Sequence, residues 1–243
     1  MLPSDPINYI MLSSIMAGEA LDKYTEDLKK AGRNWSKRIV AKHRYERARE
    51  AEAQKAEEES IRDPLTDLPN SRALKRAFAW ETSRAQRYSR PLAALFLDID
   101  GFKKYNDEFL HINGNKVLVA LAKTMKRQTR NIDIPGRFGG EEFMILLPET
   151  DLQKALEVAE RVRLATVSDL SVGRPVGNGN EKVLRDITVS VGVAQWQKGQ
   201  SFDDFVDLAD QAMYYAKKQG RNRVAGINNS REMIQFGVGW SQQ

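Results

Sequence analysis

The chain has 243 residues, of which 41% are hydrophobic and 29% are charged, with a formal net charge of +5 and no cysteine. This composition predicts a cytoplasmic globular protein of one or two domains, and it excludes a disulfide framework and a thiolate metal site. No apolar run is long enough to span a membrane, and the mixed charges suit a small anionic substrate at least as well as nucleic acid, which is not expected as a partner.

The first segment, residues 1–62, is predicted to be a helical stalk. From Glu19 to Arg62 the composition shifts to Ala, Glu, Lys and Arg with a single glycine, Gly32, which predicts one long helix. Two interpretations stay open for it, a solvated single helix and a dimerising stalk. Its first half carries apolar residues at alternating three- and four-residue steps, as a helix pairing seam does: Leu21, Tyr24, Leu28, Ala31 and Trp35.

A boundary follows at Arg62–Asn70, where two prolines and several capping residues end one helix and begin the next. Residues from Ser71 to about Ser89 have a helical pattern. After Pro91, the near-continuous apolar run Leu92–Leu97 is typical of a strand that is buried on both faces. This strand is therefore expected at the centre of a sheet.

The central strand ends abruptly in Asp98-Ile99-Asp100. Alternation puts the two aspartates on one face of the sheet and Ile99 on the other. Unpaired buried carboxylates are costly, no histidine is near in sequence, and hard oxygen ligands favour magnesium or manganese. Because a strand-end aspartate can also cap the following helix, that second interpretation stays open.

A second acidic stretch is Arg137–Phe143, with the sequence RFGGEEF, followed by the apolar run Met144–Pro148. Two β-forming runs joined by Gly139-Gly140 predict a hairpin, because glycine supplies the positive φ of tight turns. Glu141 and Glu142 would lie at its tip, where they repel each other unless a cation lies between them. A divalent metal that carries a phosphate is one explanation, and an ordinary acidic turn is the other.

The other segments alternate between helix and strand patterns. Helices are predicted over Ile112–Arg130, Leu152–Ala165 and Asp203–Lys218, a strand over Ile187–Trp196, a short polar segment over Gly101–Asp107 and an exposed loop over Ser171–Glu181. The tail, Ile227–Gln243, is expected to be either an edge strand or frayed. Lys217 and Arg221, at the end of the last helix, could reach phosphates or could merely complement the helix dipole.

This order of elements predicts an α/β (α+β) domain with one mostly antiparallel sheet covered by helices. The acidic strand end and the acidic hairpin tip would lie side by side on neighbouring strands. Such an arrangement is typical of a two-metal, polymerase-like site, in which carboxylates hold ions that bridge a nucleoside triphosphate.

Four motifs in this order resemble the GGDEF family of diguanylate cyclases over about residues 61–226. They are Asp63–Arg72, Asp98–Lys103 with Asn106-Asp107 and His111, Arg137–Phe143, and Ala216-Lys217 with Gly220-Arg221-Asn222. The resemblance implies a homodimer that condenses two GTP into cyclic di-GMP and releases two pyrophosphates. It also implies a five-stranded, polymerase-palm or nucleotide-cyclase-like sheet in a catalytic domain, 63–226. The resemblance does not cover residues 1–60 or the end of the chain, where a stalk, 1–62, and a tail, 227–243, are expected.

The resemblance implies roles for individual residues as well. Asp98, Glu141 and Glu142, with the carbonyl of Ile99, would hold two Mg²⁺ (or Mn²⁺) ions in each active site. No residue is a convincing general base, so metal-assisted deprotonation of the attacking hydroxyl is expected. The expected substrate contacts are Phe102, Lys103, Lys217 and Arg221 at the triphosphate, Asn106 and the position of Asn115 at the base, and Gly139 and Gly140 where the backbone approaches the ligand.

Arg130-Asn131-Ile132-Asp133 lies just before the hairpin and is similar to the family's product-inhibition motif, Arg-x-x-Asp. An arginine fork can bind guanine or phosphate, and an aspartate can accept hydrogen bonds from guanine. Cyclic di-GMP is therefore expected as a feedback ligand of Arg130 and Asp133.

Two departures from the family pattern lie on either side of His111. Leu110 stands where a glycine is usual, and Asn115 replaces the aspartate that pairs with guanine. A carboxylate only accepts, whereas an amide offers one acceptor and one donor and could pair with adenine. GTP remains the expected substrate because Asn106 persists. The alternatives are a hybrid cyclase that also uses ATP and makes cyclic GMP-AMP, an inactive nucleotide-binding signalling module, and a helical interaction protein.

Overall fold

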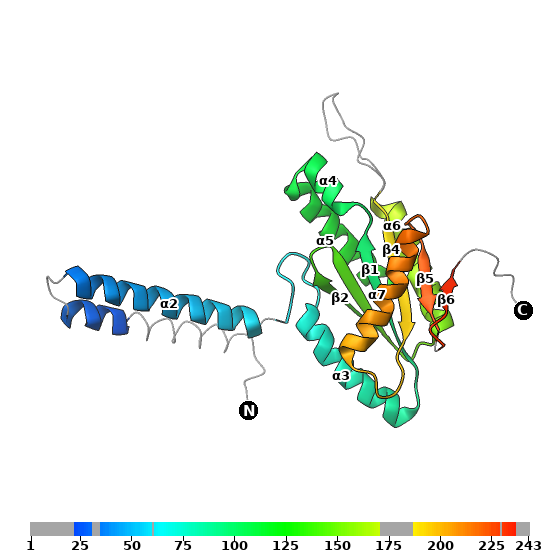
Figure 1. Cartoon of the computed structure of the whole chain (residues 1–243), viewed down its shortest axis with the longest axis horizontal. Coiled ribbons are helices and arrows are strands. Elements are labelled where there is room, and N and C mark those ends of the chain that lie inside the picture. The colour runs from blue at the N-terminus through cyan, green and yellow to red at the C-terminus, as the bar shows by residue number, and fades with distance from the viewer. Residues whose placement is uncertain (1–21, 31–34, 60, 171–186, 229, 237–243) are drawn as a thin grey trace, which may run out of the picture. The chain divides into compact units, whose positions relative to one another are not determined.

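The computed structural model describes residues 22–30, 35–59, 61–170, 187–228 and 230–236 (Figure 1). The chain divides into two compact units, residues 1–60 and 61–243, which are described separately. Within the described residues, no helix combines the length and the apolar character needed to cross a membrane.

The described residues of the N-terminal unit form two helices where one long helix was predicted. Residues 22–30 form the first helix, and α2 (Trp35–Glu59) is the second. The rings of Tyr24 and Tyr45 stack with their centroids 4.8 Å apart. In one straight helix, this separation in sequence would place the two residues about 31 Å apart. The two helices therefore pack side by side, and the prediction of a continuous helix from Glu19 to Arg62 is wrong.

The predicted pairing seam is partly used within this helix pair. Ala41, on α2, is buried, and Asp27 lies 4.0 Å from Arg44 across the two helices. Tyr24 contacts Tyr45 in its own chain, so this part of the seam is not free for another copy. The other predicted seam positions Leu21, Ala31 and the side chain of Trp35 lie outside the described residues.

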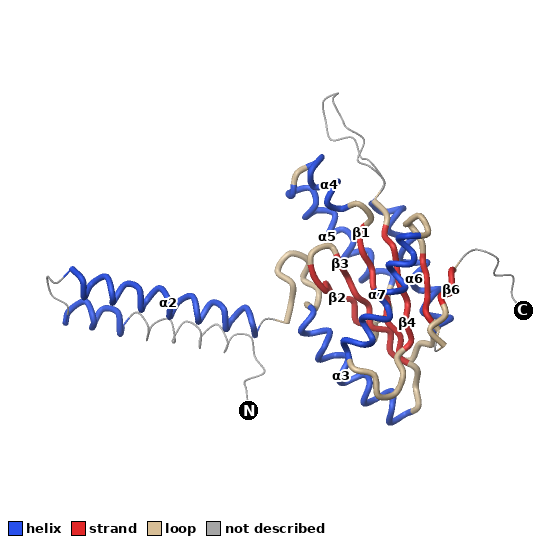
Figure 2. The backbone as a smooth tube through the Cα atoms, in the orientation of Figure 1, coloured by secondary structure: helices blue, strands red, loops and turns tan. Residues whose placement is uncertain are grey.

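The second unit is a sheet with helices on both sides (Figure 2). Its elements are α3 (Ser71–Tyr88), β1 (Leu92–Ile99), α4 (Phe102–Phe109), α5 (His111–Gln128), β2 (Ile134–Gly139), β3 (Glu142–Pro148), α6 (Leu152–Leu170), β4 (Val189–Gln195), α7 (Phe202–Lys218), β5 (Val224–Ile227) and β6 (Met233–Gln235). The predicted loop over Ser171–Glu181 lies outside the described residues.

The strands lie in the order β2-β3-β1-β4-β5-β6, and every neighbouring pair is antiparallel except β4 and β5. The predicted α+β class with a mostly antiparallel sheet is confirmed. The described sheet has six strands where five were expected, because part of the tail, Met233–Gln235, adds the edge strand β6. The alternating Ile234 and Phe236 pack on the core, while Val238 and Trp240 lie outside the described residues.

Alternate side chains of β1 enter two separate cores. Leu95 and Leu97 pack with α5 and α6 on one face, whereas Leu92 and Phe96 pack with α3 and α7 on the other. All eight residues of β1 are buried, as expected for a strand covered by helices on both faces. Continuing this alternation puts Asp98 on the face of Phe96, toward α7.

A glycine on β4 lets α7 approach this face closely. A Cβ atom at Gly192 would lie 1.9 Å from the carbonyl oxygen of Ala209 and 2.3 Å from the amide nitrogen of Met213, both on α7. No side chain fits there, so the backbone of α7 lies directly on the sheet. This contact fixes the helix whose last turn carries Lys217.

Candidate active site

The two acidic stretches meet in the register of the sheet. Asp98, near the end of β1, is the antiparallel partner of Glu142, the first residue of β3. Directly opposed residues of an antiparallel pair project on the same face. Glu141 immediately precedes β3, in the turn. The structure therefore brings all three predicted metal-binding side chains to one end of the neighbouring strands β1 and β3.

The hairpin turn differs in detail from the prediction. Gly139 pairs with Glu142 and belongs to β2, after a register shift at the preceding residue. The turn itself is therefore Gly140-Glu141, with Gly140 at a φ of +27°. Glu141 lies at the tip as predicted, whereas Glu142 projects from a strand.

Lys217 holds the buried carboxylate of Asp98. Its Nζ lies 2.8 Å from Oδ1 of Asp98, whose side chain is only 10% exposed. Burial raises the pKa of the Asp98 carboxyl, and the Lys217 ammonium opposes that rise. Lys217 is thus directed into the acidic site, which the helix-dipole interpretation of this lysine does not require.

Asp210 is a fourth carboxylate of this site, and it was not predicted. It lies on α7, two helical turns before Lys217, and its charge raises the pKa values of both Asp98 and Glu142. The seven-residue spacing to Lys217 places both on one side of α7. The sequence offered this spacing as the sign that Asp210 belongs to the site. The spacing identifies Asp210 only once Lys217 is known to face the sheet.

The carboxylates destabilise each other's charged forms. Burial and then the negative charge of Asp98 raise the pKa values of both Glu141 and Glu142. Burial also raises the pKa of Asp210, against the effect of Lys217. Among the described residues, Lys217 thus offsets only part of the repulsion between Asp98, Glu141, Glu142 and Asp210, and the charge of Asp100 adds to the repulsion at Asp98. Additional positive charge would relieve it.

This donor set fits hard divalent cations such as Mg²⁺, which prefer carboxylate and carbonyl oxygens. Among the described residues, however, no three His, Cys, Asp or Glu side chains are grouped closely enough to hold a metal ion. The oxygen donors are therefore in the right place but not yet convergent, with the Lys217 ammonium beside Asp98.

Asp100, in contrast, is turned toward a neighbouring loop. Its carboxylate accepts hydrogen bonds from the hydroxyls of Thr188 and Ser190, both at 2.7 Å, and from the backbone N–H of Asn222 at 3.0 Å. The two aspartates of the predicted acidic strand end thus have different environments. Only Asp98 faces Glu142.

The base-contact residues of the prediction lie on α4 and α5. Oδ1 of Asn106 is buried and accepts no hydrogen bond from the described part of the chain. A Cβ atom on Gly114 would lie 1.9 Å from this oxygen, so the glycine leaves room for the Asn106 side chain. Asn115 is exposed next to Gly114. An unpaired buried acceptor of this kind suits a ligand that donates a hydrogen bond.

Phe102 and Lys103, predicted at the triphosphate, begin α4, which the prediction treated only as a short polar segment. The Phe102 side chain is buried in the core, so only its backbone can face a ligand, while Lys103 is exposed. At the other end of α4, Leu110 adopts φ 70° and ψ 151°. Glycine adopts this conformation readily, whereas it costs a non-glycine residue on the order of 1–3 kcal/mol.

Arg137 fastens the hairpin turn to the start of this unit. Its guanidinium donates to the carbonyl of Gly140 at 2.6 Å and to the carboxylate of Asp63 at 3.0 Å. Asp63 also accepts from the backbone and the hydroxyl of Thr66, and these interactions together hold its pKa below the usual range despite burial. The position of Glu141 therefore depends on a residue near the beginning of the domain.

The Arg130-x-x-Asp133 motif lies near the opposite end of β3. Asp133 is buried and accepts from Arg130 Nη2 at 2.7 Å, and the same nitrogen donates to Thr150 Oγ1 at 2.8 Å. Asp133 raises the already high pKa of Arg130. The side chain of Arg130 remains half exposed, so it can still meet a ligand.

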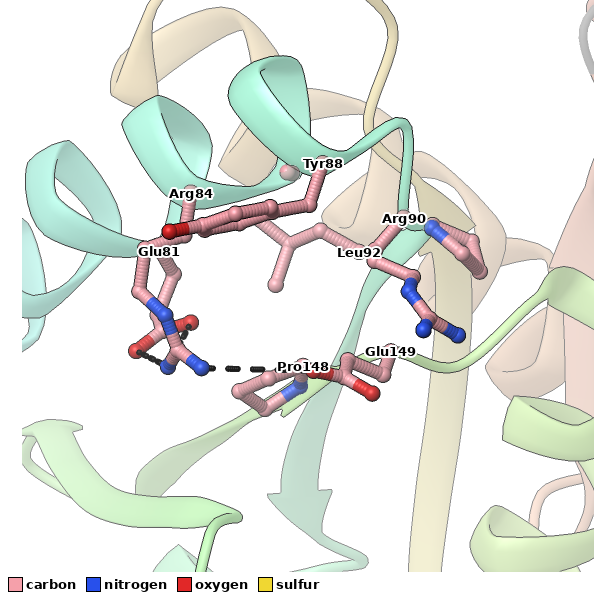
Figure 3. Close-up of a pocket in the computed structure, with 9 residues that line it drawn as sticks. Glu81, Arg84, Tyr88, Arg90, Leu92, Pro148 and Glu149 are labelled. Atoms are coloured by element: carbon pink, nitrogen blue, oxygen red, sulfur yellow. Dashed lines mark hydrogen bonds and ion pairs between the residues drawn. The ribbon is translucent and has the colours of Figure 1, made fainter.

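A pocket lies beside this motif, at the beginning of β1 (Figure 3). It is lined by Glu81, Arg84, Ala85, Tyr88, Arg90, Pro91, Leu92, Pro148 and Glu149. Arg130 donates to the carbonyl of Pro148, which links the motif to the pocket wall. Leu92 and Asp98 are six residues apart on β1, or about 20 Å, so this pocket and the acidic site are at opposite ends of the strand.

We predict that Glu142→Gln stabilises the protein in the absence of metal. Because the folded-state pKa of Glu142 is raised, the folded protein holds this proton more tightly than the unfolded chain does. The stability that the bound proton of Glu142 contributes is therefore lost as the pH rises from the ordinary pKa range of a glutamate through the raised pKa of the folded protein. Thermal unfolding with a chelator is expected to show a gain of a few degrees at about pH 7 that shrinks at about pH 5.

The matched control is Glu108→Gln, which neutralises an exposed glutamate on α4. This variant should leave the unfolding temperature nearly unchanged at both pH values. An equal gain from the two substitutions, or no gain from Glu142→Gln, would contradict the repulsion argued for the acidic site.

Comparisons with known proteins place this chain in a family. The family model described as diguanylate cyclase, GGDEF domain, matches residues 60–223. The diguanylate cyclase DgcP of Pseudomonas aeruginosa is 37% identical over 169 residues, which are 69% of this chain and 24% of that protein. The chain spans only about a quarter to a third of the length of the first curated relatives that it matches.

Two solved structures are similar as well. The GGDEF domain of DgcB from Caulobacter crescentus in complex with c-di-GMP is 30% identical, with a TM-score of 0.62 over 68% of this chain and 92% of that one. The diguanylate cyclase SiaD from Pseudomonas aeruginosa, in complex with its activator SiaC, is 36% identical, with a TM-score of 0.62 over 90% of this chain and 82% of that one. The chain therefore belongs to the GGDEF family of diguanylate cyclases.

Proposed function

We propose that this protein is a diguanylate cyclase that condenses two GTP molecules into cyclic di-GMP and two pyrophosphates. The observation that carries the proposal is the pairing of Asp98 with Glu142 beside Glu141, with Lys217 directed at Asp98. Family membership supports the same activity. A structural or binding-only domain has no need for four mutually repelling carboxylates at one edge of a sheet.

In this proposal Asp98, Glu141, Glu142 and the carbonyl of Ile99 hold two Mg²⁺ or Mn²⁺ ions. When bound, the ions would neutralise charge on the α-phosphate and on the leaving pyrophosphate and would acidify the attacking hydroxyl. The residues of the chain do the rest of the positioning. Lys217, released from Asp98, and Arg221 would bind the triphosphate, with Phe102 and Lys103 beside it, and Gly139 and Gly140 would let it approach the hairpin.

Each active site holds one nucleotide in this mechanism, so two copies of the protein are needed. The 3′-oxygen of one nucleotide forms a bond to the α-phosphorus of the other, the bond to pyrophosphate breaks, and the hydroxyl proton is released. The same step in the opposite direction closes the ring. A homodimer with twofold symmetry places the two nucleotides antiparallel, which turns a bimolecular reaction into an oriented one.

We further propose that residues 1–62 form the segment that brings two copies together and receives a regulatory protein, with the catalytic domain at 63–226 and a tail at 227–243. The likeness to SiaD supports this, because it covers 90% of the chain. The unit 61–243 accounts for 183 of the 243 residues, about 75%, so the likeness must include part of the N-terminal unit. The solved structure of SiaD is a complex with its activator, SiaC.

Asn115 keeps a second product under consideration. Asn115 is exposed and follows Gly114, the glycine that leaves room for the Asn106 side chain. Toward guanine, an amide replaces one acceptor of the usual carboxylate with a donor, whereas toward adenine it can both accept and donate. Loss of one buried pairing is worth about 1–3 kcal/mol, enough to relax base selectivity at least tenfold. Cyclic GMP-AMP is therefore the second candidate product.

We predict that the purified protein with Mg²⁺ and equal GTP and ATP makes mainly cyclic di-GMP, with cyclic GMP-AMP as the minor product. Chromatography with mass detection separates the two. Asp98→Asn, which removes a metal ligand and the partner of Lys217, should lower turnover at least about a hundredfold. A protein that binds GTP but forms no cyclic product would contradict the proposal and favour an inactive signalling module.

The base selectivity is tested in the same assay by Asn115→Asp. Restoring the carboxylate should raise the preference for GTP over ATP by about tenfold. Asn113→Asp adds the same charge two residues away and serves as the control, with no change of preference expected. Pure cyclic di-GMP from the unmodified protein under equal nucleotides would eliminate the hybrid alternative.

For feedback, we predict that Arg130→Ala weakens cyclic di-GMP binding at least tenfold, because the half-exposed guanidinium beside Asp133 is the charged group available to the product. Calorimetric titration measures the affinity, and the initial rate of catalysis should stay unchanged. Arg76→Ala, an exposed arginine on α3, is the control. If cyclic di-GMP binds Arg130→Ala as tightly as the unmodified protein, the feedback site is wrong.

We predict that deletion of residues 1–60 lowers specific activity at low protein concentration and that the loss is recovered at high concentration. The reason is mass action, since a weakened dimer reassembles when its subunits are concentrated. Activity measured across a dilution series, with light scattering for the oligomeric state, tests this. Unchanged activity at the lowest concentration would remove the proposed role of this segment.

A further inference from the structure

The turn after α7 has an unusual backbone conformation. Arg221 and Asn222 are consecutive non-glycine residues with positive φ, 62° and 47°. Such residues cost free energy and persist only where the surroundings hold them. Something must therefore fix this turn, which carries the exposed side chain of Arg221.

Asp100 supplies one of the two attachments that side chains elsewhere in the described domain make to this turn, in addition to the backbone N–H of Arg221, which donates to the carbonyl of Ala216 at 3.2 Å. Its Oδ2 accepts the backbone N–H of Asn222 at 3.0 Å and the hydroxyl of Thr188 at 2.7 Å, while Oδ1 accepts the hydroxyl of Ser190 at 2.7 Å. The two hydroxyls come from the start of β4, and they orient the carboxylate toward the turn. Asp100 thus joins the end of β1, the start of β4 and the turn after α7.

Arg163, on α6, supplies the other attachment. Its guanidinium donates to Oδ1 of Asn222 at 2.6 Å and is itself held by Glu160 at 2.6 Å. Asn222 is therefore fixed by its backbone through Asp100 and by its side chain through Arg163. Because both attachments are on Asn222, they also restrain the backbone of the preceding residue, Arg221.

We propose that Asp100 is a positioning residue that sets the turn so that Arg221 faces the triphosphate, and that it is not a metal ligand. The inference rests on the proposed function, in which Arg221 contacts the triphosphate. Three donors already occupy the Asp100 carboxylate, whereas Asp98, two residues earlier, faces Glu142. The two aspartates then have different roles: Asp98 binds the metal, and Asp100 positions Arg221.

The test measures binding of α,β-methylene GTP, which cannot react, and of GMP, which lacks the β- and γ-phosphates, to the full chain with Mg²⁺. We expect Arg221→Ala and Asp100→Ala each to weaken binding of the triphosphate analogue by roughly three- to tenfold, the scale of one charge-assisted hydrogen bond. Binding of GMP should not change. The double variant should bind no more weakly than Arg221→Ala alone, because Asp100 acts through that arginine.

Two further variants separate positioning from a general loss of stability. Asp100→Asn keeps an oxygen that can accept the Asn222 N–H, so it should restore most of the affinity. Asp151→Ala removes a carboxylate that caps α6 through the N–H of Lys154 and should lower the unfolding temperature without changing affinity for the analogue. If Asp100→Ala does not fold, Thr188→Val, which removes one orienting hydroxyl, carries the same expectation with a smaller effect.

Unchanged affinity in a folded Asp100→Ala protein would overturn the inference. Additive losses in the double variant would overturn it too, because they mean that Asp100 acts independently of Arg221. If Asp100→Ala binds the analogue with normal affinity but that binding no longer depends on Mg²⁺, Asp100 would be a metal ligand instead. If the unmodified protein fails to bind the analogue at all, the proposed function fails first, and the role of Asp100 falls with it.

Discussion

The crowding of carboxylates around Asp98 is the constraint on which the site depends. Four acidic side chains lie at one edge of the sheet, and Lys217 is the ammonium directed at them. Lys217 relieves part of the repulsion between these carboxylates, and further cations would relieve more of it. A protein selected for stability alone would not keep it. The proposed function accounts for this arrangement, because metal ions and the nucleotide that they carry would supply the missing positive charge.

The fold tolerates this crowding because β1 is supported on both faces up to its last residues. Leu97 and Ile99 lie in the core on one face of the sheet. Asp98, between them, lies on the opposite face, where it contacts Lys217 of α7. Gly192 brings α7 onto the sheet at this face. The alternation of side chains along β1 therefore determines which residues pack in the core and which face the acidic site. A register shift of one residue would exchange the two sets.

Local patterns were sufficient for α3, α5, α6, α7 and β1, whose period or apolar run is strong. They failed where the outcome depended on contacts distant in sequence. The reversal between the two N-terminal helices depends on the Tyr24–Tyr45 contact, since one alanine-rich composition suits one helix or two. The strand β5 has only four residues, one of them Gly226, and is defined by its parallel pairing with β4. Asp210 became part of the site only through the approach of α7.

The position of Glu141 links the site to the start of the domain. Arg137 donates both to the carbonyl of Gly140, in the turn, and to Asp63, which Thr66 also holds. Because the side chains of Arg137 and Asp63 are only 15% and 16% exposed, the pair is shielded from solvent and stronger than a surface ion pair. A displacement of Asp63 would therefore be felt at Gly140 and so at the neighbouring glutamate. Asp63 lies three residues after residue 60, where the N-terminal unit ends, so Arg137 joins the beginning of the second unit to the turn that carries Glu141.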